Sequence, residues 1–400
     1  MKLDYRHTKY ACYMSYICSA VVNNFAPLLF VVFQKNYGLG LDELAIIISL
    51  NFFVQMIVDF LGAKYVDKIG YRGSLIIALS AVGLGLVAMG TLPMLLSPYI
   101  GLMISVCIYA IGSGLLEVMV SPTVEALPSD AKAASMSLLH SFYCWGSVLV
   151  VVVSTLYFRL FGVDNWRILC FIWAVLPCVT IALFTKVPII PFGKEEDRVP
   201  LKKMFSQKVF WLFALIMLSA GAAELAVSQW ASLFAEIGLG VSKATGDLLG
   251  PCLFAVMMGI ARALYGKFGE RLRVGKALII SGFICIVGYL ITVFSPMPVI
   301  SLLGCGACGF GVAIMWPGTL SLATENKLSG GTALFGLLAM AGDIGCSTGP
   351  ALVAAVSERY SILGSDLKAG LLCAVLFPII LVIGVMAVRI QMYKKDNSPV

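Results

Sequence analysis

Charged residues divide the chain into long apolar stretches. A tilted helix that crosses a bilayer takes about 20–25 residues. Four uncharged gaps fit one such helix each: Lys9 to Lys35, Lys132 to Arg159, Arg167 to Lys186, and Lys368 to Arg389. Two longer gaps contain prolines that end one helix and begin the next, so each predicts a hairpin of two helices: Arg72 to Glu117 and Lys276 to Glu325. Four further apolar stretches bring the prediction to about twelve spanning helices: 44–61, 209–235, 246–265 and 329–357.

The composition agrees with this pattern and excludes several classes of protein. Hydrophobic residues make up 60% of the 400 residues and charged residues only 12%, with a mean hydropathy of +0.97. Soluble domains carry about 45–50% apolar and about 25% charged residues, so a soluble enzyme, a disordered chain and a nucleic-acid-binding protein are excluded. Only helices and closed barrels span lipid, and apolar runs of this length exclude the alternating pattern of a barrel. The sequence therefore predicts an all-α membrane protein.

The twelve cysteines stand inside apolar stretches and are expected to be small packing residues rather than a disulfide framework. Cys305 and Cys308 have metal-site spacing, but no histidine accompanies them and four glycines surround them, which favours close helix packing. We therefore expect no metal and no cofactor. An intramembrane enzyme is not expected either, because the isolated acids supply no nucleophile–base or metal constellation. The sequence shows no nucleotide-binding domain, so ATP-driven transport by this chain is not expected.

Basic residues are distributed unevenly between the two sides that twelve spans define. Of the 28 lysines and arginines, 22 fall on the side of the two termini and of the 188–208 connection. Cytoplasmic loops carry such an excess, so both termini and this connection are expected to be cytoplasmic. The charged N-terminal segment leads into a full-length span without a cleavage pattern, so we expect no removable signal peptide. The predicted location is the plasma membrane.

The two halves of the chain share a repeat of 200 residues. Gly38-Leu39-Gly40 recurs as Gly238-Leu239-Gly240, and the turn proline Pro98 recurs as Pro298. Chance coincidence in apolar sequence is the alternative, although the same offset also aligns the predicted spans. Six spans in each half give both halves the same orientation, as in repeats related by an axis along the membrane normal. The predicted organisation is an N-terminal six-helix bundle, a cytoplasmic connecting loop and a C-terminal six-helix bundle: 1–190, 191–208 and 209–400.

The loop after the second predicted span carries a recognisable motif. Asp67-Lys68-Ile69-Gly70-Tyr71-Arg72 resembles the signature loop of the major facilitator superfamily, in which an acid and a base precede a glycine and further bases. The resemblance implies 12 transmembrane helices in two six-helix bundles related by a pseudo-twofold axis. It also implies a gating role for the residues of this loop and of the matching loop in the second half: Asp67, Lys68, Gly70, Arg72, Glu270 and Arg271. The alternative is that the bases only follow the positive-inside distribution.

Ionisable residues inside the predicted spans are few, and they mark function because a charge in lipid is costly. They are Asp59, Glu117, His140, Glu224 and Asp343. Asp59 lies near the cytoplasmic end of its span, and we expect a gating pair with Arg72 or Arg262. A carboxyl group in a dehydrated cavity can hold a proton near neutral pH and release it when water enters. The proton-coupling candidates are therefore Glu117, Glu224 and Asp343, with His140 as a relay. Permanently protonated acids that serve only helix packing are the alternative.

Polar and aromatic residues on plausible cavity faces accompany these acids. Carboxylates, amides and aromatic rings suit a hydroxylated solute, because they supply donors, acceptors and a flat apolar face. The candidate substrate-binding residues are Asn23, Asn24, Gln55, Glu117, His140, Tyr143, Glu224 and Trp230. For Trp230, a place in the core or at the membrane interface is an equally good interpretation.

Three short motifs resemble the fucose-permease branch of the superfamily: Gly114-Leu115-Leu116-Glu117 with Ser121-Pro122, Leu139-His140 leading to Gly146, and Gly221-Ala222-Ala223-Glu224 with Trp230. The resemblance implies proton-coupled uptake of a small sugar, with Glu117 as a coupling or sugar-binding acid. Relatives of this type place an acid in the first span, where this sequence has Asn23 and Asn24.

Taken together, these patterns predict a monomeric secondary transporter in the membrane lipid. Its expected partners are a small polar, sugar-like solute and the proton as the coupling ion, with no nucleic acid. A proton-driven efflux antiporter for drugs or metabolites is the alternative.

Overall fold

The computed structural model describes residues 4–128, 132–190, 205–268, 273–326 and 331–396, apart from the side chains of 63–68, 122, 125, 132–137, 266–268, 324–325, 331–336 and 391–396. Within these ranges the chain is almost entirely helical and contains no strand. Twelve helices of the described chain are long and apolar enough to cross a membrane, which agrees with the predicted number. The prediction of an all-α membrane protein is confirmed.

The first half of the chain forms six spans, numbered here in chain order. Span 1 is interrupted by a short 3₁₀ turn that contains Pro27. The elements are α1 (Tyr5–Phe25), η1 (Ala26–Leu29) and α2 (Phe30–Tyr37) in span 1; α3 (Leu41–Ile69) in span 2; α4 (Tyr71–Leu95) in span 3; α5 (Pro98–Ala126) in span 4; α6 (Lys132–Phe161) in span 5; and η2 (Val163–Asn165) with α7 (Trp166–Phe184) in span 6.

The second half forms the other six spans. Two of them contain π-helical turns, η4 and η5, at their outer ends. The elements are α9 (Lys208–Ser228), α10 (Ala231–Leu233) and η4 (Phe234–Gly238) in span 7; α11 (Lys243–Asp247), η5 (Leu248–Cys252) and α12 (Leu253–Phe268) in span 8; α13 (Val274–Phe294) in span 9; α14 (Pro298–Val312) and α15 (Met315–Glu325) in span 10; α16 (Gly331–Ser357) in span 11; and α17 (Asp366–Ala374) with α18 (Leu376–Asp396) in span 12.

Glycines end the first span of each half. Gly38 follows α2 with a φ of 68°, and Gly240 follows span 7 with a φ of 67°, a conformation that glycine adopts without strain. The offset of 200 residues pairs Gly38 with Gly238 instead, so the structural repeat slips by two residues at this point. The slip coincides with η4, a π-helical turn that has no counterpart at the end of span 1.

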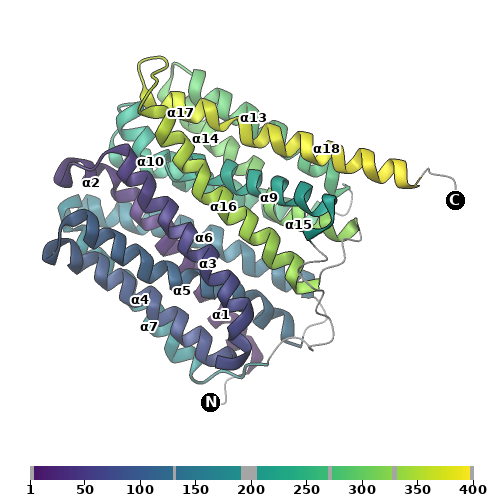
Figure 1. Cartoon of the computed structure of the whole chain (residues 1–400). Coiled ribbons are helices and arrows are strands. Elements are labelled where there is room, and N and C mark those ends of the chain that lie inside the picture. Colours follow the sequence, from purple (N-terminus) through teal and green to yellow (C-terminus); the bar gives the residue numbers. More distant parts are fainter. Residues whose placement is uncertain (1–3, 129–131, 191–204, 269–272, 327–330, 397–400) are drawn as a thin grey trace.

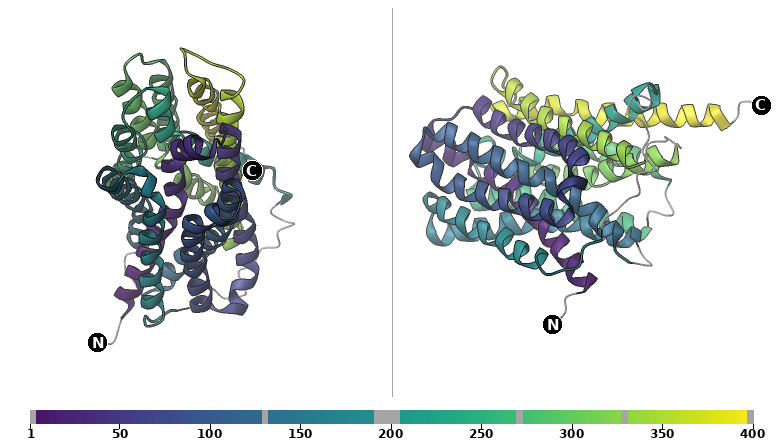
Figure 2. Two further views of the ribbon diagram at one scale, coloured as in Figure 1. Left: turned by 90° about the vertical axis from the view of Figure 1, so that its left-hand side faces the viewer. Right: turned by 60° about the horizontal axis from the view of Figure 1, so that its bottom comes forward.

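Helix contacts repeat from one half to the other. In each half the third span packs against the fourth and the sixth: α4 contacts α5 and α7, and α13 contacts α14 and α18. The first span contacts the fifth in both halves, through α1 with α6 and α9 with α16. Between the halves, α3 packs against α16, which is span 2 against span 11, and α12 packs against α6, which is span 8 against span 5. The second contact therefore repeats the first with the two halves interchanged. Two bundles related by an axis along the membrane normal show this pattern, and Figures 1 and 2 show them side by side.

Close packing between α13 and α14 depends on small residues. A Cβ atom added at Gly288 would lie 2.8 Å from the backbone nitrogen of Cys308, and one added at Gly304 would lie 2.6 Å from the backbone nitrogen of Thr292. Cys305 and Cys308 are free and fully buried in this contact. These two cysteines therefore serve as packing residues, as the sequence predicts.

We expect Gly288→Ala to destabilise the protein, because the added methyl group forces α13 and α14 apart, and overpacking of this kind costs about 1–3 kcal/mol. The measurement is the Tm of the purified protein in detergent. Gly83→Ala is the matched control, because a Cβ atom at Gly83 lies 3.5 Å from Pro177 Cγ, which is ordinary contact. Equal Tm values for the two variants would contradict the importance of this contact.

Candidate functional site

Asn23, on α1, is the centre of a buried hydrogen-bond network. Its side-chain oxygen accepts from Asn51 Nδ2 (3.0 Å) and Gln55 Nε2 (3.1 Å) on α3. Its side-chain nitrogen donates to Ser113 Oγ on α5 (3.5 Å) and to Tyr143 Oη on α6 (3.4 Å). The network joins spans 1, 2, 4 and 5, and it orients the amide of Asn23 because both of its polar atoms have partners.

Two members of this network, Asn51 and Ser113, are not among the residues predicted from the sequence. Asn51, Gln55 and Asp59 recur every four residues, which places them on one face of α3, so the sequence holds a signal for Asn51. An ordinary serine in an apolar span, such as Ser113, gives no such signal. Gln229, also not predicted, donates from Nε2 to a backbone carbonyl of α1 (3.2 Å) and links the network to span 7.

A small cavity lies between the two halves and brings together three of the predicted residues. Asn24 and Tyr143 line it from the first half together with Ser147, and Glu224 lines it from α9. Asn24 Nδ2 donates to Ser147 Oγ (3.1 Å), which orients this amide. The cavity measures about 20 Å³, which is room for about one water molecule and too little for a sugar. A solute can therefore bind here only when the halves move apart.

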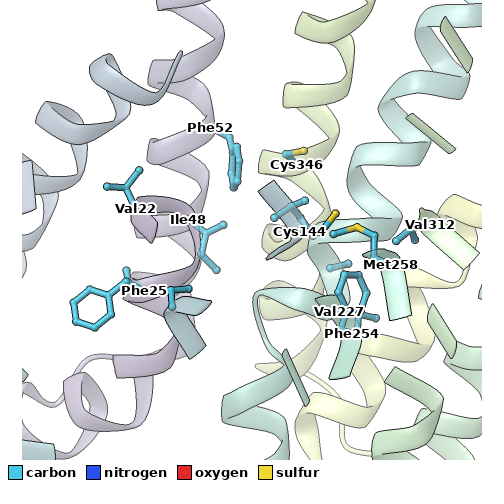
Figure 3. Close-up of a cluster of buried hydrophobic side chains, with 14 of the residues drawn as sticks. Val22, Phe25, Ile48, Phe52, Cys144, Val227, Phe254, Met258, Val312 and Cys346 are labelled. Atoms are coloured by element: carbon cyan, nitrogen blue, oxygen red, sulfur yellow. The ribbon is translucent and has the colours of Figure 1, made fainter. Parts of the chain in front are cut away.

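Apolar side chains of both halves are buried in the same region. Figure 3 shows Ile48 and Phe52 of α3 on one side and Phe254 and Met258 of α12 on the other. All four side chains are buried, and the last two also line the cavity. The region between the halves therefore combines amide, hydroxyl, carboxyl and apolar surface.

Three carboxyl groups meet one helical turn from Gln55, toward the predicted cytoplasmic end. Asp59 on α3, Glu117 on α5 and Asp343 on α16 each place one carboxylate oxygen within 4.8 Å of the others. Asp59 and Asp343 are 7% and 4% exposed, whereas Glu117 is more accessible. Two unit negative charges at such a separation repel by about 3–4 kcal/mol at an effective dielectric constant of about 20. The three groups therefore need protons or a cation to offset their repulsion.

The expected gating pair between Asp59 and an arginine is not formed in this structure. Arg72 donates to the carbonyl of Phe184, the last residue of α7, and to that of Val187 just beyond the helix (2.8 Å). Arg262 donates to the carbonyl of Ala313 (3.1 Å), in the break between α14 and α15. The last turn of a helix leaves carbonyls without backbone partners, and both guanidinium groups satisfy such carbonyls instead of the carboxylate.

The other gating candidates belong to the two signature loops. Gly70 precedes α4 with a φ of 83°, for which a glycine is required. The side chains of Asp67 and Lys68, and the whole of Glu270 and Arg271, lie outside the described part of the structure. The gating role of these residues stays a prediction.

His140 and Trp230 do not line the cavity. The imidazole of His140 packs edge-on against Tyr16, with 5.4 Å between the ring centroids, and its backbone carbonyl accepts from Arg262 (3.3 Å). Trp230 is fully buried, and its indole nitrogen donates to the carbonyl of Pro350 (3.1 Å). In this conformation Trp230 is a packing residue, which is the second of the two interpretations that the sequence allows.

The sequence as a whole matches one family. The sequence profile of the Major Facilitator Superfamily matches residues 12–390, nearly the entire chain. The chain belongs to the Major Facilitator Superfamily. Proteins of this superfamily are membrane transporters, and the predictions of the family and of the twelve-helix fold are confirmed. A comparison with curated proteins finds no match.

Solved structures of other facilitators share the fold. The chain is similar to the nucleoside transporter NupG, with 14% identity over 96% of this chain and 98% of that chain and a TM-score of 0.69. It is similar to a single-residue variant of the E. coli fucose:proton symporter FucP, with 17% identity over 95% and 98% of the two chains and a TM-score of 0.69. It is also similar to a D-xylose-proton symporter, with 15% identity over 96% of this chain and 95% of that chain and a TM-score of 0.75. At these identities the similarity shows the fold.

Polar contacts join the two halves of this facilitator at the predicted extracellular end. Lys35 in span 1 pairs with Glu236 in span 7 (3.2 Å). Lys243, at the start of span 8, pairs with the buried Asp247 (3.1 Å) and donates to the carbonyl of Leu28 in span 1 (2.6 Å). Asp247 is not among the predicted residues, although its spacing of four from a lysine is a signal for an ion pair on a helix. These contacts link span 1 of the first half to spans 7 and 8 of the second half.

Proposed function

We propose that this transporter moves a small polar, sugar-like solute by alternating access, in symport with protons. The observation that carries the proposal is the position of Glu224. Its carboxyl group shares one cavity between the halves with the amide of Asn24 and the hydroxyl groups of Tyr143 and Ser147. Solute and proton thus meet in one compartment, which is the condition for their coupled movement.

The lining favours a solute with hydroxyl groups on a carbon ring. Amides and hydroxyl groups supply both donors and acceptors, and Phe254 and Met258 supply an apolar face for ring C–H groups. Three similar structures support this class of solute, since their names describe a fucose:proton symporter, a D-xylose-proton symporter and a nucleoside transporter.

Proton coupling follows from the surroundings of Glu224. Among the described residues, Glu224 takes part in no ion pair. The charge of Arg262 acts on Glu224 without forming an ion pair with it, and the burial of the carboxyl group outweighs this effect. Closure of the cavity therefore favours the protonated form, and entry of water favours proton release. Solute binding that closes the cavity is thereby linked to proton binding. Glu117 and Asp343, the other two coupling candidates, lie apart from the cavity lining.

Flux measurements in proteoliposomes test this proposal. The purified protein is reconstituted and offered a panel of hexoses, pentoses and nucleosides, with and without an imposed pH gradient. One-to-one symport is expected to accumulate its solute about tenfold on the alkaline side for a gradient of one pH unit. Accumulation on the acidic side would indicate an efflux antiporter. Transport of the whole panel without any response to pH would contradict proton coupling.

A further inference from the structure

The carboxyl groups of Asp59, Glu117 and Asp343, called here the acidic cluster, are separate from the residues that line the cavity. Asp59 and Glu117 belong to the first half of the chain and Asp343 to the second, so the cluster lies across the interface between the halves. Both carboxylate oxygens of Asp59 and one of Asp343 are buried and, with the carboxyl groups ionised, have no hydrogen-bond donor among the described residues. The two side chains lie close enough for a hydrogen bond when one of them holds a proton. Buried carboxylate oxygens this close together require a positively charged partner, which is either a proton held by the cluster or a bound cation.

The described basic side chains do not supply that positive charge. No lysine or arginine among them forms an ion pair with any member of the acidic cluster. The sequence predicts Arg72 or Arg262 as the partner of Asp59, but both arginines donate to backbone carbonyls instead. Without a positive partner, the ionised carboxylates would stand as several negative charges in a region of low dielectric constant, which is unfavourable.

We propose that the acidic cluster binds one hard metal cation, Na⁺ or a divalent ion such as Ca²⁺, between the two halves. Carboxylate oxygens are the ligands that such cations prefer. At metal–oxygen distances of about 2.3–2.6 Å, ligands on opposite sides of the ion lie about 4.6–5.2 Å apart. One oxygen from each of the three carboxyl groups lies within 4.8 Å of the other two, which fits an ion between them. Glu117 is the accessible member, so water can complete the coordination on its side.

A cation in this position links ion binding to the opening of the transporter. Asp343 moves with the second half, so opening at the predicted cytoplasmic end removes one of three carboxylates from the site and lowers its affinity. Cation binding therefore stabilises the closed arrangement, and opening releases the ion. The inference extends the proposed function, because it adds an ion site to the same transport cycle, but it uses acids other than Glu224.

Thermal unfolding of the purified full-length protein in detergent tests the inference. Choline chloride is replaced by NaCl at constant ionic strength, and CaCl₂ or MgCl₂ is added in separate titrations. The Tm is expected to rise by several degrees, in a saturable manner, with one of these cations and not with choline. A response to Na⁺ alone identifies a monovalent site, and a response to Ca²⁺ or Mg²⁺ a divalent site. A wild-type protein whose Tm responds to none of them would overturn the inference.

Asparagine variants then locate the ion. Asp59→Asn and Asp343→Asn keep the size of the side chain and remove its charge, so both are expected to lose the cation-dependent rise in Tm. Asp164→Asn is the matched control, because Asp164 is an exposed acid in η2. A rise that survives in both cluster variants would place the ion elsewhere. The wild-type titration decides the question even where a variant does not fold.

The two proposals fail separately. Solute accumulation driven by pH, without any effect of a cation on Tm, leaves the proposed function standing and removes the cation site. A saturable cation effect without pH-driven accumulation does the reverse.

Discussion

Glu224→Gln is expected to abolish the pH-driven accumulation of solute and to leave solute exchange intact. Glutamine has the size and the hydrogen-bonding groups of a protonated glutamate but no proton to release, so the solute can cross without proton movement. For a gradient of one pH unit, we expect about tenfold accumulation by the wild-type protein and no accumulation by the variant. Counterflow of labelled solute, with equal pH on both sides of the proteoliposome membrane, measures exchange independently of the gradient.

Glu358→Gln is the matched control for this experiment. Glu358 is an exposed acid directly after α16, so its replacement is expected to leave both accumulation and counterflow at the wild-type level. Tenfold accumulation by Glu224→Gln would assign proton coupling to another group. Loss of counterflow as well would show that the carboxylate of Glu224 is needed for solute binding itself.

The number of spans could be predicted because the physical constraint is severe. A charge in lipid is costly, so charged residues mark the ends of spans, and prolines such as Pro98 and Pro298 mark the hairpins between them. The π-helical turns η4 and η5 could not be predicted in this way. They lie where spans 7 and 8 pack against each other, through α10, α11 and these turns, and the hydrophobic pattern carries no record of that packing.

The site could be predicted where a residue is unusual for a membrane span. Glu224 and Asn24 stand out in apolar stretches, and the structure brings them to one cavity. Ser147 and Ser228, which also line the cavity, are indistinguishable from the other serines of the spans. The sequence predicts Asp59 beside an arginine because both lie near one end of the bundle, whereas the fold brings Asp59 close to Asp343 of the other half. Contacts between the halves are set by tertiary packing, which local sequence patterns do not encode.

The two equivalent interfaces between the halves differ in chemistry. The contact of α3 with α16 holds Asp59 and Asp343, whereas the contact of α6 with α12 holds Arg262, which donates to Cys144 Sγ (3.1 Å). One interface therefore carries acids and the other a base. The repeat specifies the arrangement of the helices, and the side chains at each interface specify what that interface can bind.

A disulfide between positions 49 and 347 is expected to stop transport. Ser49 Oγ donates to the carbonyl of Ser347 (3.0 Å), and Ser347 Oγ donates to the carbonyl of Ser49 (3.1 Å), so α3 and α16 are in close contact here. Cysteines at both positions place two thiols near the range in which a disulfide forms. Oxidation of the Ser49→Cys/Ser347→Cys protein is expected to reduce solute flux to the level of protein-free liposomes, and a reducing agent is expected to restore it.

The physical reason for this expectation is the size of the cavity. A space of about 20 Å³ admits no sugar, so each transport cycle requires the halves to separate, and a disulfide between α3 and α16 prevents their separation at this point. The two single substitutions are the controls, because each adds only one thiol to the twelve native free cysteines, and both are expected to keep their flux after oxidation. Full flux in an oxidised double variant, with the crosslink verified by mass spectrometry, would mean that α3 and α16 stay together throughout the cycle. The path of the solute would then have to open along the contact of α6 with α12.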